Sequence, residues 1–138
     1  MSEFNLVSRN IFISGLILCG FIAILSANEP SEIELELWKQ EFIDLVKEGE
    51  KNFNDERLSK NGLACGQCHM DGENTHPESY PKFKNQLWEV VNIGQMINWC
   101  IVNPLKGKAL ELDSKKMLSL ISYLTYQRRG VKLDPGKD

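Results

Sequence analysis

One run of five residues, Cys65-Gly66-Gln67-Cys68-His69, constrains this chain more than any other feature. The three-residue step between the cysteines brings both thiols to one side of a helical turn, where they can add to the two vinyl groups of one haem. His69 follows directly and is placed to coordinate the iron from the proximal side. The motif therefore predicts one covalent haem c, held by thioethers from Cys65 and Cys68, with His69 as the proximal ligand.

Two other kinds of site use similar residues. A zinc site needs four ligands, and the adjacent Cys68 and His69 cannot easily serve one tetrahedral ion. A dithiol redox motif normally lies in a βαβ unit, and the sequence has no such pattern. Haem attachment is therefore the better interpretation of the motif.

The N-terminal part of the sequence predicts export. Residues 11–25 are uncharged and largely apolar, with Arg9 shortly before them. This segment suits the apolar core of a secretory signal and is shorter than the ~20 residues that span a bilayer. We expect residues 1–27 to be either a cleaved signal peptide or a retained anchor to the inner membrane. Residues 28–138 would then form one cytochrome c domain in the periplasm.

The net charge restricts the classes of partner that we expect, and the cysteine content singles out Cys100. The formal net charge is −3, and residues 1–27 contribute nothing to it because they carry one acidic and one basic residue. This balance offers no basic face for nucleic acid, and we expect membrane contact only if the N-terminal segment is retained. Once residues 1–27 are removed, the chain keeps Cys65, Cys68 and Cys100. Haem attachment thus leaves Cys100 unpaired in an oxidising compartment, which needs an explanation.

Apolar residues at helical spacing predict an all-α domain. The predicted helices cover residues 31–53, 86–102 and 114–129. Ser31 and Glu34 form a capping box at the start of the first, and Asp113 or Ser114 caps the last. No alternating strand pattern appears, and the long irregular segment 54–85 is typical of chain that wraps around a ligand. We predict a cytochrome c-like fold with three to four helices around the attached haem.

Two longer patterns resemble a known family. Upstream of the motif stand Gly49, Phe53 and the run Asp55-x-x-Leu58-Ser59-x-Asn61-Gly62. These residues resemble the approach to the haem in small bacterial cytochromes c of sulfur oxidation. A later block is similar to the cytochrome domains of thiosulfate dehydrogenase and of the Sox thiosulfate-oxidising system; it consists of Cys100-Ile101, Gly107-Lys108, Asp113-Ser114-x-x-Met117 and Tyr123-Leu124. Together the two patterns span residues 45–130.

The resemblance implies how the helices pack. In cytochromes c the N-terminal helix crosses the C-terminal helix at a glycine, and aromatic residues close the contact. Gly49, Phe53 and Tyr123 stand where such a crossing would use them. The alternative from the residues alone is that Gly49 simply ends the first helix, as glycine often does.

The distal ligand of the iron has several candidates. Cys100 is the leading one, because it is the cysteine left over after haem attachment, and the resemblance places an axial cysteine in this block. The alternatives are Met96, four residues earlier on the same helical face, and Met117, which could equally be a core residue. His76 comes only seven residues after His69, too close to reach the opposite face of the haem easily.

The nature of this ligand bears on function. A thiolate lowers the reduction potential of haem iron, whereas ligation by methionine raises it. Lys106 and Lys108 could add positive charge near the site and attract a sulfur oxyanion, although two solvated loop lysines are the simpler interpretation.

We expect a periplasmic cytochrome c that transfers single electrons in sulfur-compound oxidation, with another cytochrome or a sulfur-oxidising enzyme subunit as its redox partner. Thiosulfate dehydrogenase carries two haem domains, whereas this chain has one motif, which favours an electron-transfer protein over a complete enzyme. The alternatives are a catalytic or sulfur-binding haem subunit that uses Cys100 at the iron, or a haem-based sensor of a small ligand.

Overall fold

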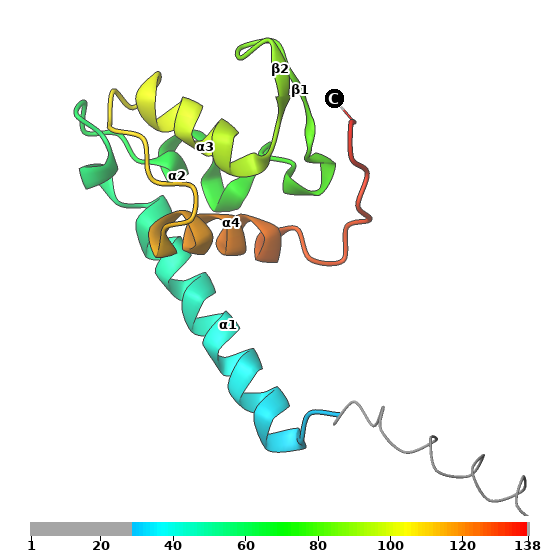
Figure 1. Ribbon diagram of the computed structural model, residues 1–138. Coiled ribbons are helices and arrows are strands. Elements are labelled where there is room, and N and C mark those ends of the chain that lie inside the picture. The colour runs from blue at the N-terminus through cyan, green and yellow to red at the C-terminus, as the bar shows by residue number, and fades with distance from the viewer. Residues whose placement is uncertain (1–28, 138) are drawn as a thin grey trace, which may run out of the picture.

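The computed structural model describes residues 29–137, which form a mainly helical domain (Figure 1). The α-helices are α1 (Glu32–Phe53), α2 (Cys65–Cys68), α3 (Ile93–Val102) and α4 (Lys115–Gln127), and 3-10 turns lie at Glu56–Leu58, Met70–Gly72 and Pro77–Ser79. Strands β1 (Lys82–Lys84) and β2 (Glu89–Val91) form an antiparallel hairpin in which Phe83 is opposite Val90. The predicted helical architecture is confirmed, and the hairpin is a small addition to it.

The predicted N-terminal segment, residues 1–27, lies outside the described residues. Within residues 29–137, none of the helices has the length and apolar character needed to cross a membrane.

Helix α1 begins and continues as its sequence predicts. Ser31 Oγ accepts a hydrogen bond from the backbone N–H of Glu34 (3.3 Å), and the Glu34 carboxylate accepts one from the N–H of Ser31 (2.9 Å). This is the expected capping box. The helix does not end at Gly49 but runs on to Phe53, so the interpretation of Gly49 as a helix end is wrong.

Gly49 instead marks the crossing of α1 and α4. A Cβ atom at this position would meet the backbone carbonyl of Ser119 and lie 2.7 Å from Cβ of Tyr123. Only glycine therefore lets the two helix backbones touch here. Beside the contact, the Asn52 side-chain amide donates a hydrogen bond to Ser119 Oγ (2.9 Å). The crossing that the family resemblance implied is present.

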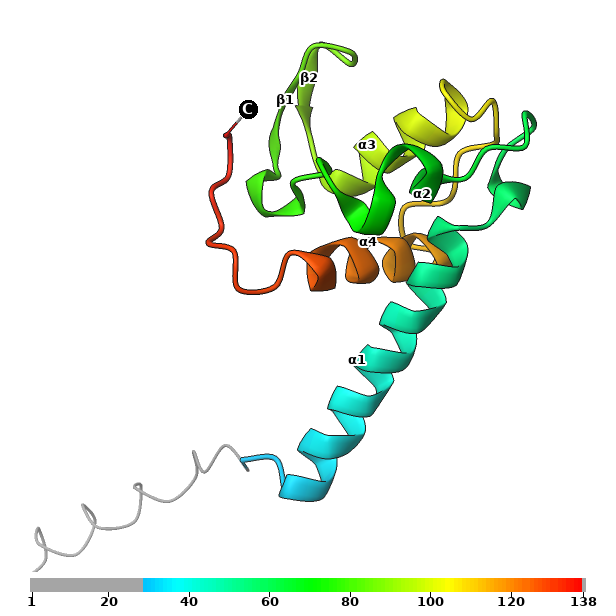
Figure 2. The ribbon, with the colours of Figure 1, turned by 180° about the vertical axis from the view of Figure 1, so that it is seen from behind.

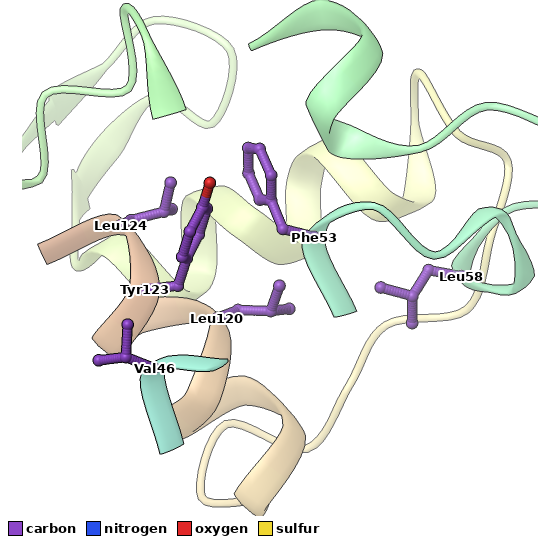
Figure 3. Close-up of a cluster of buried hydrophobic side chains, with 6 residues drawn as sticks. All are labelled: Val46, Phe53, Leu58, Leu120, Tyr123 and Leu124. Carbon is purple, nitrogen blue, oxygen red and sulfur yellow. The ribbon is translucent and has the colours of Figure 1, made fainter. Parts of the chain in front are cut away.

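The apolar core lies at this crossing (Figure 3). The Phe53 and Tyr123 rings pack with their centroids 5.2 Å apart at an interplanar angle of 47°. The buried cluster consists of Val46, Phe53, Leu58, Leu120, Tyr123 and Leu124. Helix α1 from the N-terminal part of the described chain and helix α4 from its C-terminal part thus contribute to one core. The segment that carries the cysteine motif packs against this core.

Two predicted helices have different limits in the structure. Helix α3 starts at Ile93 rather than at residue 86, because Asn92 and Gln95 form a capping box there, with hydrogen bonds of 2.8 and 3.0 Å. Residues 86–91 form the hairpin turn and β2 instead. Helix α4 is capped by Ser114, whose Oγ accepts from the N–H of Met117 (3.2 Å), and it ends at Gln127.

The C-terminal segment forms hydrogen bonds with the turn that precedes the hairpin. Figure 1 shows this segment running from α4 towards β1. The Asp134 N–H donates to the Glu78 carbonyl (2.9 Å), and the Gly136 N–H donates to the Ser79 carbonyl (3.0 Å). The Arg128 guanidinium forms a two-pronged ion pair with the Glu78 carboxylate (2.7 and 3.2 Å) and lowers the pKa of Glu78 to about 2. These contacts fix the Pro77–Ser79 turn against the end of α4.

The crossing gives a direct test of the fold. Gly49→Ala should destabilise the protein, because the added Cβ meets backbone that cannot move aside. Overpacking costs about 1–3 kcal/mol, which outweighs the ~1 kcal/mol that alanine gains over glycine in helix propensity. Urea unfolding followed by circular dichroism measures the difference. Glu41→Ala, on the exposed side of α1, is the control and should change stability little. Equal stability of the two variants would contradict the close helix contact.

Candidate haem-binding site

A cavity opens between the core and the segment that carries the cysteine motif. Its empty volume is about 910 Å³, including the part that opens to solvent. Cofactor pockets are typically ~300–1,000 Å³ and mostly apolar. One side of the cavity is apolar, formed by Phe53, Ile93, Ile97, Leu120 and Leu124. The space is thus of a size and character that suit a large, flat, apolar cofactor.

The short helix α2 positions the two motif cysteines. Its start is fixed by Gln67, whose Oε1 accepts a hydrogen bond from the N–H of Ala64 (2.9 Å). Cys65 is partly buried and lines the cavity, while Cys68, one turn later, is exposed. Gly66 lies between them because a Cβ there would meet the side chain of Asn54, the residue that caps α1. The end of α1 therefore lies directly against the helix that carries the cysteines.

The thiols of the site are in a desolvated environment. Burial raises the pKa of the Cys65 thiol to about 11, with a smaller contribution from Cys100. Burial also raises the pKa of Cys100, and the positive charge of Lys84 opposes that rise. Cys65 and Cys100 are thus protonated at neutral pH. A thioether bond to carbon replaces the S–H group by a neutral sulfur, and a metal ion stabilises a thiolate, so either bond avoids the cost of a buried, isolated charge.

His69 presents one ring nitrogen for coordination. Its Nδ1 lies 2.9 Å from the carbonyl oxygen of Glu73. A carbonyl can only accept a hydrogen bond, so Nδ1 carries the proton and Nε2 keeps its lone pair. The same second bond orients metal-ligating histidines in general. The tautomer and the position of His69 on the cavity wall fit the role of a proximal iron ligand.

The structure separates the candidates for the distal ligand. Cys100 and Met96, one turn apart on α3, both line the cavity, as does His76. Met117 is fully buried on α4 and is not among the lining residues. The cavity therefore brings Cys65 and His69 together with Cys100 and Met96. Cys100 as the iron ligand stays a prediction.

The positive charge at the cavity comes from other lysines than the sequence suggested. Lys106 and Lys108 are both exposed and lie outside the cavity lining. Lys82 and Lys84 line it instead, on the same face of β1. Lys82 and Lys84 alternate with Phe83, as residues on the two faces of a β-strand do. A pattern of three residues is too short, however, to predict a strand from the sequence.

Tyr80 holds the two lysines together. The Nζ atoms of Lys82 and Lys84 lie 5.0 and 5.9 Å from the centroid of its ring. Lys82 is only 5% exposed, which is unusual for a lysine. Burial raises the pKa of Tyr80 to about 12, with a further contribution from Cys100. Tyr80, Lys84 and Cys100 are therefore close enough to interact electrostatically across the cavity.

Within the part of the chain that the structure describes, no group of three or more His, Cys, Asp or Glu side chains gathers closely enough to hold a metal ion.

Comparison with known proteins identifies the domain. A family model described as the SoxA/TsdA cytochrome c domain matches residues 48–133, which is more than half of the chain. The chain belongs to this family. It is therefore a haem-binding cytochrome c domain, and the resemblance stated from the sequence is confirmed.

Two curated relatives and one solved structure are similar to parts of the chain. Thiosulfate dehydrogenase of Psychrobacter arcticus is 31% identical over 74 residues, which cover 48% of this chain and 23% of that protein. Thiosulfate dehydrogenase of Allochromatium vinosum is 30% identical over 83 residues, 51% of this chain and 31% of that protein. The matches thus cover less than a third of either relative.

The structural comparison confirms the fold. The crystal structure of SoxXA from P. pantotrophus aligns with a TM-score of 0.64 and 18% identity, over 73% of this chain and 39% of that one. At this identity the likeness supports the fold alone, and the predicted cytochrome c-like fold is confirmed by it.

Proposed function

We propose that this chain is a periplasmic cytochrome that carries one covalent haem c and transfers single electrons in the oxidation of thiosulfate or related sulfur compounds. The observation that carries the proposal is the largely apolar cavity onto which Cys65 and His69 of the motif open and which Cys100 also lines. When bound there, haem supplies one reversible one-electron couple of its iron.

The residues of the chain would divide the work as follows. Cys65 and Cys68 hold the cofactor by thioethers, and the hydrogen bond from His69 Nδ1 to Glu73 keeps the imidazole ring in a fixed orientation. The apolar wall excludes water and so limits reorganisation when charge changes. Cys68 and its neighbour Met70 are exposed, which leaves this side of the site within reach of a redox partner.

The proposed role in sulfur-compound oxidation is supported by the similarity to the curated relatives. Both curated relatives are thiosulfate dehydrogenases, but the matches cover 23% and 31% of their length. We therefore propose electron transfer in the same chemistry rather than their whole activity. Another cytochrome or a sulfur-oxidising enzyme subunit would be the redox partner. Residues 11–25 would direct the chain to the periplasm, as a signal cleaved after Ala27 or as an inner-membrane anchor.

A second candidate function is a catalytic or sulfur-binding role for the same site. The observation that favours it is the pair Lys82 and Lys84 on the cavity wall with Cys100. A lysine side chain in a poorly solvated space can attract an anion such as thiosulfate, and Lys84 is the more exposed of the two. Thiosulfate added to the isolated oxidised protein would change its absorption only under this second function, and Lys84→Gln would weaken that change.

Covalent attachment can be tested by mass. The exported protein should exceed its polypeptide mass by one haem, and the same spectrum reports whether residues 1–27 are still present. Cys68→Ala should retain haem poorly and be less stable, because the cofactor fills the centre of a small core. Cys100→Ala is the matched control and should keep the added mass. Complete removal of the pigment by acid–acetone extraction would contradict thioether attachment.

The distal ligand can be tested by substitution. We expect Cys100 to coordinate the ferric iron opposite His69, so paramagnetic resonance of the oxidised protein should give a low-spin thiolate signal. Cys100→Met should stay six-coordinate with a higher potential, because a neutral thioether stabilises ferric iron less than a thiolate does. Cys100→Ala should bind imidazole or cyanide readily.

Met117→Leu is the control for these variants, since Met117 lies in the core outside the cavity. Its spectrum should match that of the unaltered protein. If Cys100→Ala left the spectrum unchanged, the ligand would be Met96 or another residue, and the main support for the second candidate function would be lost.

A further inference from the structure

The N-terminal half of α1 carries an exposed apolar stripe. In both views of the domain this half projects beyond the rest of the described chain (Figures 1 and 2). Leu35, Trp38, Phe42 and Leu45 follow one another at intervals of three and four residues, the spacing of a single helix face. Leu35, Trp38 and Phe42 are 49%, 56% and 44% exposed. Three large apolar side chains are therefore left in water on one face.

The stripe continues the face that α1 buries against α4. Val46, Gly49 and Phe53 are the buried residues of this helix, and all lie towards its C-terminal end. Phe42 still touches the edge of the core, with its ring 6.2 Å from that of Tyr126. On the N-terminal side of Phe42, no other part of the described chain covers α1. Single exposed apolar residues are common, whereas a continuous stripe marks an interaction surface.

The border of the stripe is acidic. Between residues 32 and 48 the sequence has six carboxylates and two lysines, so this part of α1 has a net charge of 2 − 6 = −4. Both lysines already lie beside carboxylates of the same helix: Lys39 is 3.6 Å from Glu36, and Lys47 is 3.1 Å from Asp44. The remaining negative charge determines which partner the stripe can accept.

We propose that the α1 stripe docks a partner protein that presents an apolar helix or groove bordered by lysine or arginine. A helix with apolar residues at such spacing typically inserts them into a complementary apolar surface. A basic border on the partner gains attraction from the acidic border of α1. Even with Lys115 of α4 lying 3.1 Å from Glu48, the border remains net negative, so a second copy of this chain would bring two acidic borders together, and an anionic lipid surface would be repelled in the same way.

A groove at the helix crossing extends the surface. It is lined by Trp38, Phe42 and Leu45 of α1 and by Leu118 and Lys115 of α4. Leu118 is exposed as well. A side chain of the partner can therefore be anchored in a recess next to the stripe, which is how most interfaces concentrate their binding energy.

This surface is separate from the haem-binding site. None of the residues that line the groove also lines the haem cavity. The partner would be held by α1 while the exposed side of the site around Cys68 stays accessible. The proposal does not depend on the proposed function, because a variant of the stripe should leave the haem spectrum and the reduction potential unchanged.

Two synthetic helical peptides with the same leucine stripe test the proposal, one bordered by lysine and the other by glutamate. Each is labelled and titrated with the full-length haem-loaded protein, and binding is followed by fluorescence anisotropy. We expect saturable one-to-one binding of the lysine-bordered peptide, at least about tenfold tighter than that of the other, because the charges of the borders decide the difference. Added salt should reduce the preference.

Charge-neutral substitutions locate the binding. Leu35→Gln combined with Trp38→Gln should weaken binding of the lysine-bordered peptide at least about tenfold, since anchor residues carry most of the energy of an interface. Trp88→Gln is the matched control. Trp88 is 81% exposed, but it lies in the hairpin turn, away from the stripe. Its replacement should leave the affinity unchanged.

Several results would overturn the proposal. These are no saturable binding of the lysine-bordered peptide, equal binding of both peptides, or an equal loss of binding in Trp88→Gln. Analytical ultracentrifugation tests the other possible occupant of the stripe, a second copy of this chain. A dimer of the unaltered protein that Leu35→Gln with Trp38→Gln dissociates would assign the stripe to a second copy of the chain. An unchanged haem absorption spectrum in the double variant would exclude misfolding as the cause of any loss.

Discussion

The contact between α1 and α4 at Gly49 is the constraint on which the rest of the structure depends. Because no Cβ separates the two backbones there, Phe53 at the end of α1 reaches Tyr123 and the core of α4. The chain then turns at Asn54, whose side chain lies against Gly66 of the motif. The cysteine motif thus lies directly beside the place where the two helices touch.

The same contact builds the wall of the haem cavity. Phe53, Leu120 and Leu124 belong to the core at the crossing and also line the cavity. A weaker crossing would therefore affect both stability and the site. A domain of this size has a small core, so a buried cofactor is expected to contribute much of its apolar contact. We therefore expect folding and cofactor binding to be coupled through these three side chains.

Two opposing effects of the cavity act on the charge of Cys100, and burial is the larger of them. Burial alone raises the pKa of Cys100, which disfavours a free thiolate. Lys84 acts in the opposite direction, and Tyr80 holds it together with Lys82 near the cavity wall. A thiolate on iron lowers the reduction potential, and nearby positive charge partly offsets this effect. If Cys100 coordinates the iron as we propose, Lys84 of β1 would therefore act on the potential without any change of ligand.

Much of the fold could be predicted from local signals, and what could not depended on tertiary contacts. The motif, the cap at Ser31 and the position of α4 follow from short-range rules that hold wherever they occur. The hairpin was missed because its strands are three residues long, and the apolar residues before Ile93 read equally well as helix. For the same reason Lys82 and Lys84 were not predicted to line the cavity.

The role of Gly49 shows the same limit. Its sequence context allowed a helix end or a helix crossing, and only the approach of Ser119, 70 residues later, distinguishes them. The apolar face of α1 was visible in the sequence, but spacing alone does not tell that α4 covers only its C-terminal part.

We propose that three cysteines share one haem site, with Cys65 and Cys68 bonded to the cofactor and Cys100 as the third cysteine at the site. Alkylation of the haem-loaded protein, followed by peptide mapping by mass spectrometry, tests this proposal. In the unfolded protein Cys100 should be labelled, whereas Cys65 and Cys68 should not. In the folded protein Cys100 should be protected as well. Labelling of Cys65 or Cys68 after unfolding, or rapid labelling of Cys100 in the folded protein, would contradict the account.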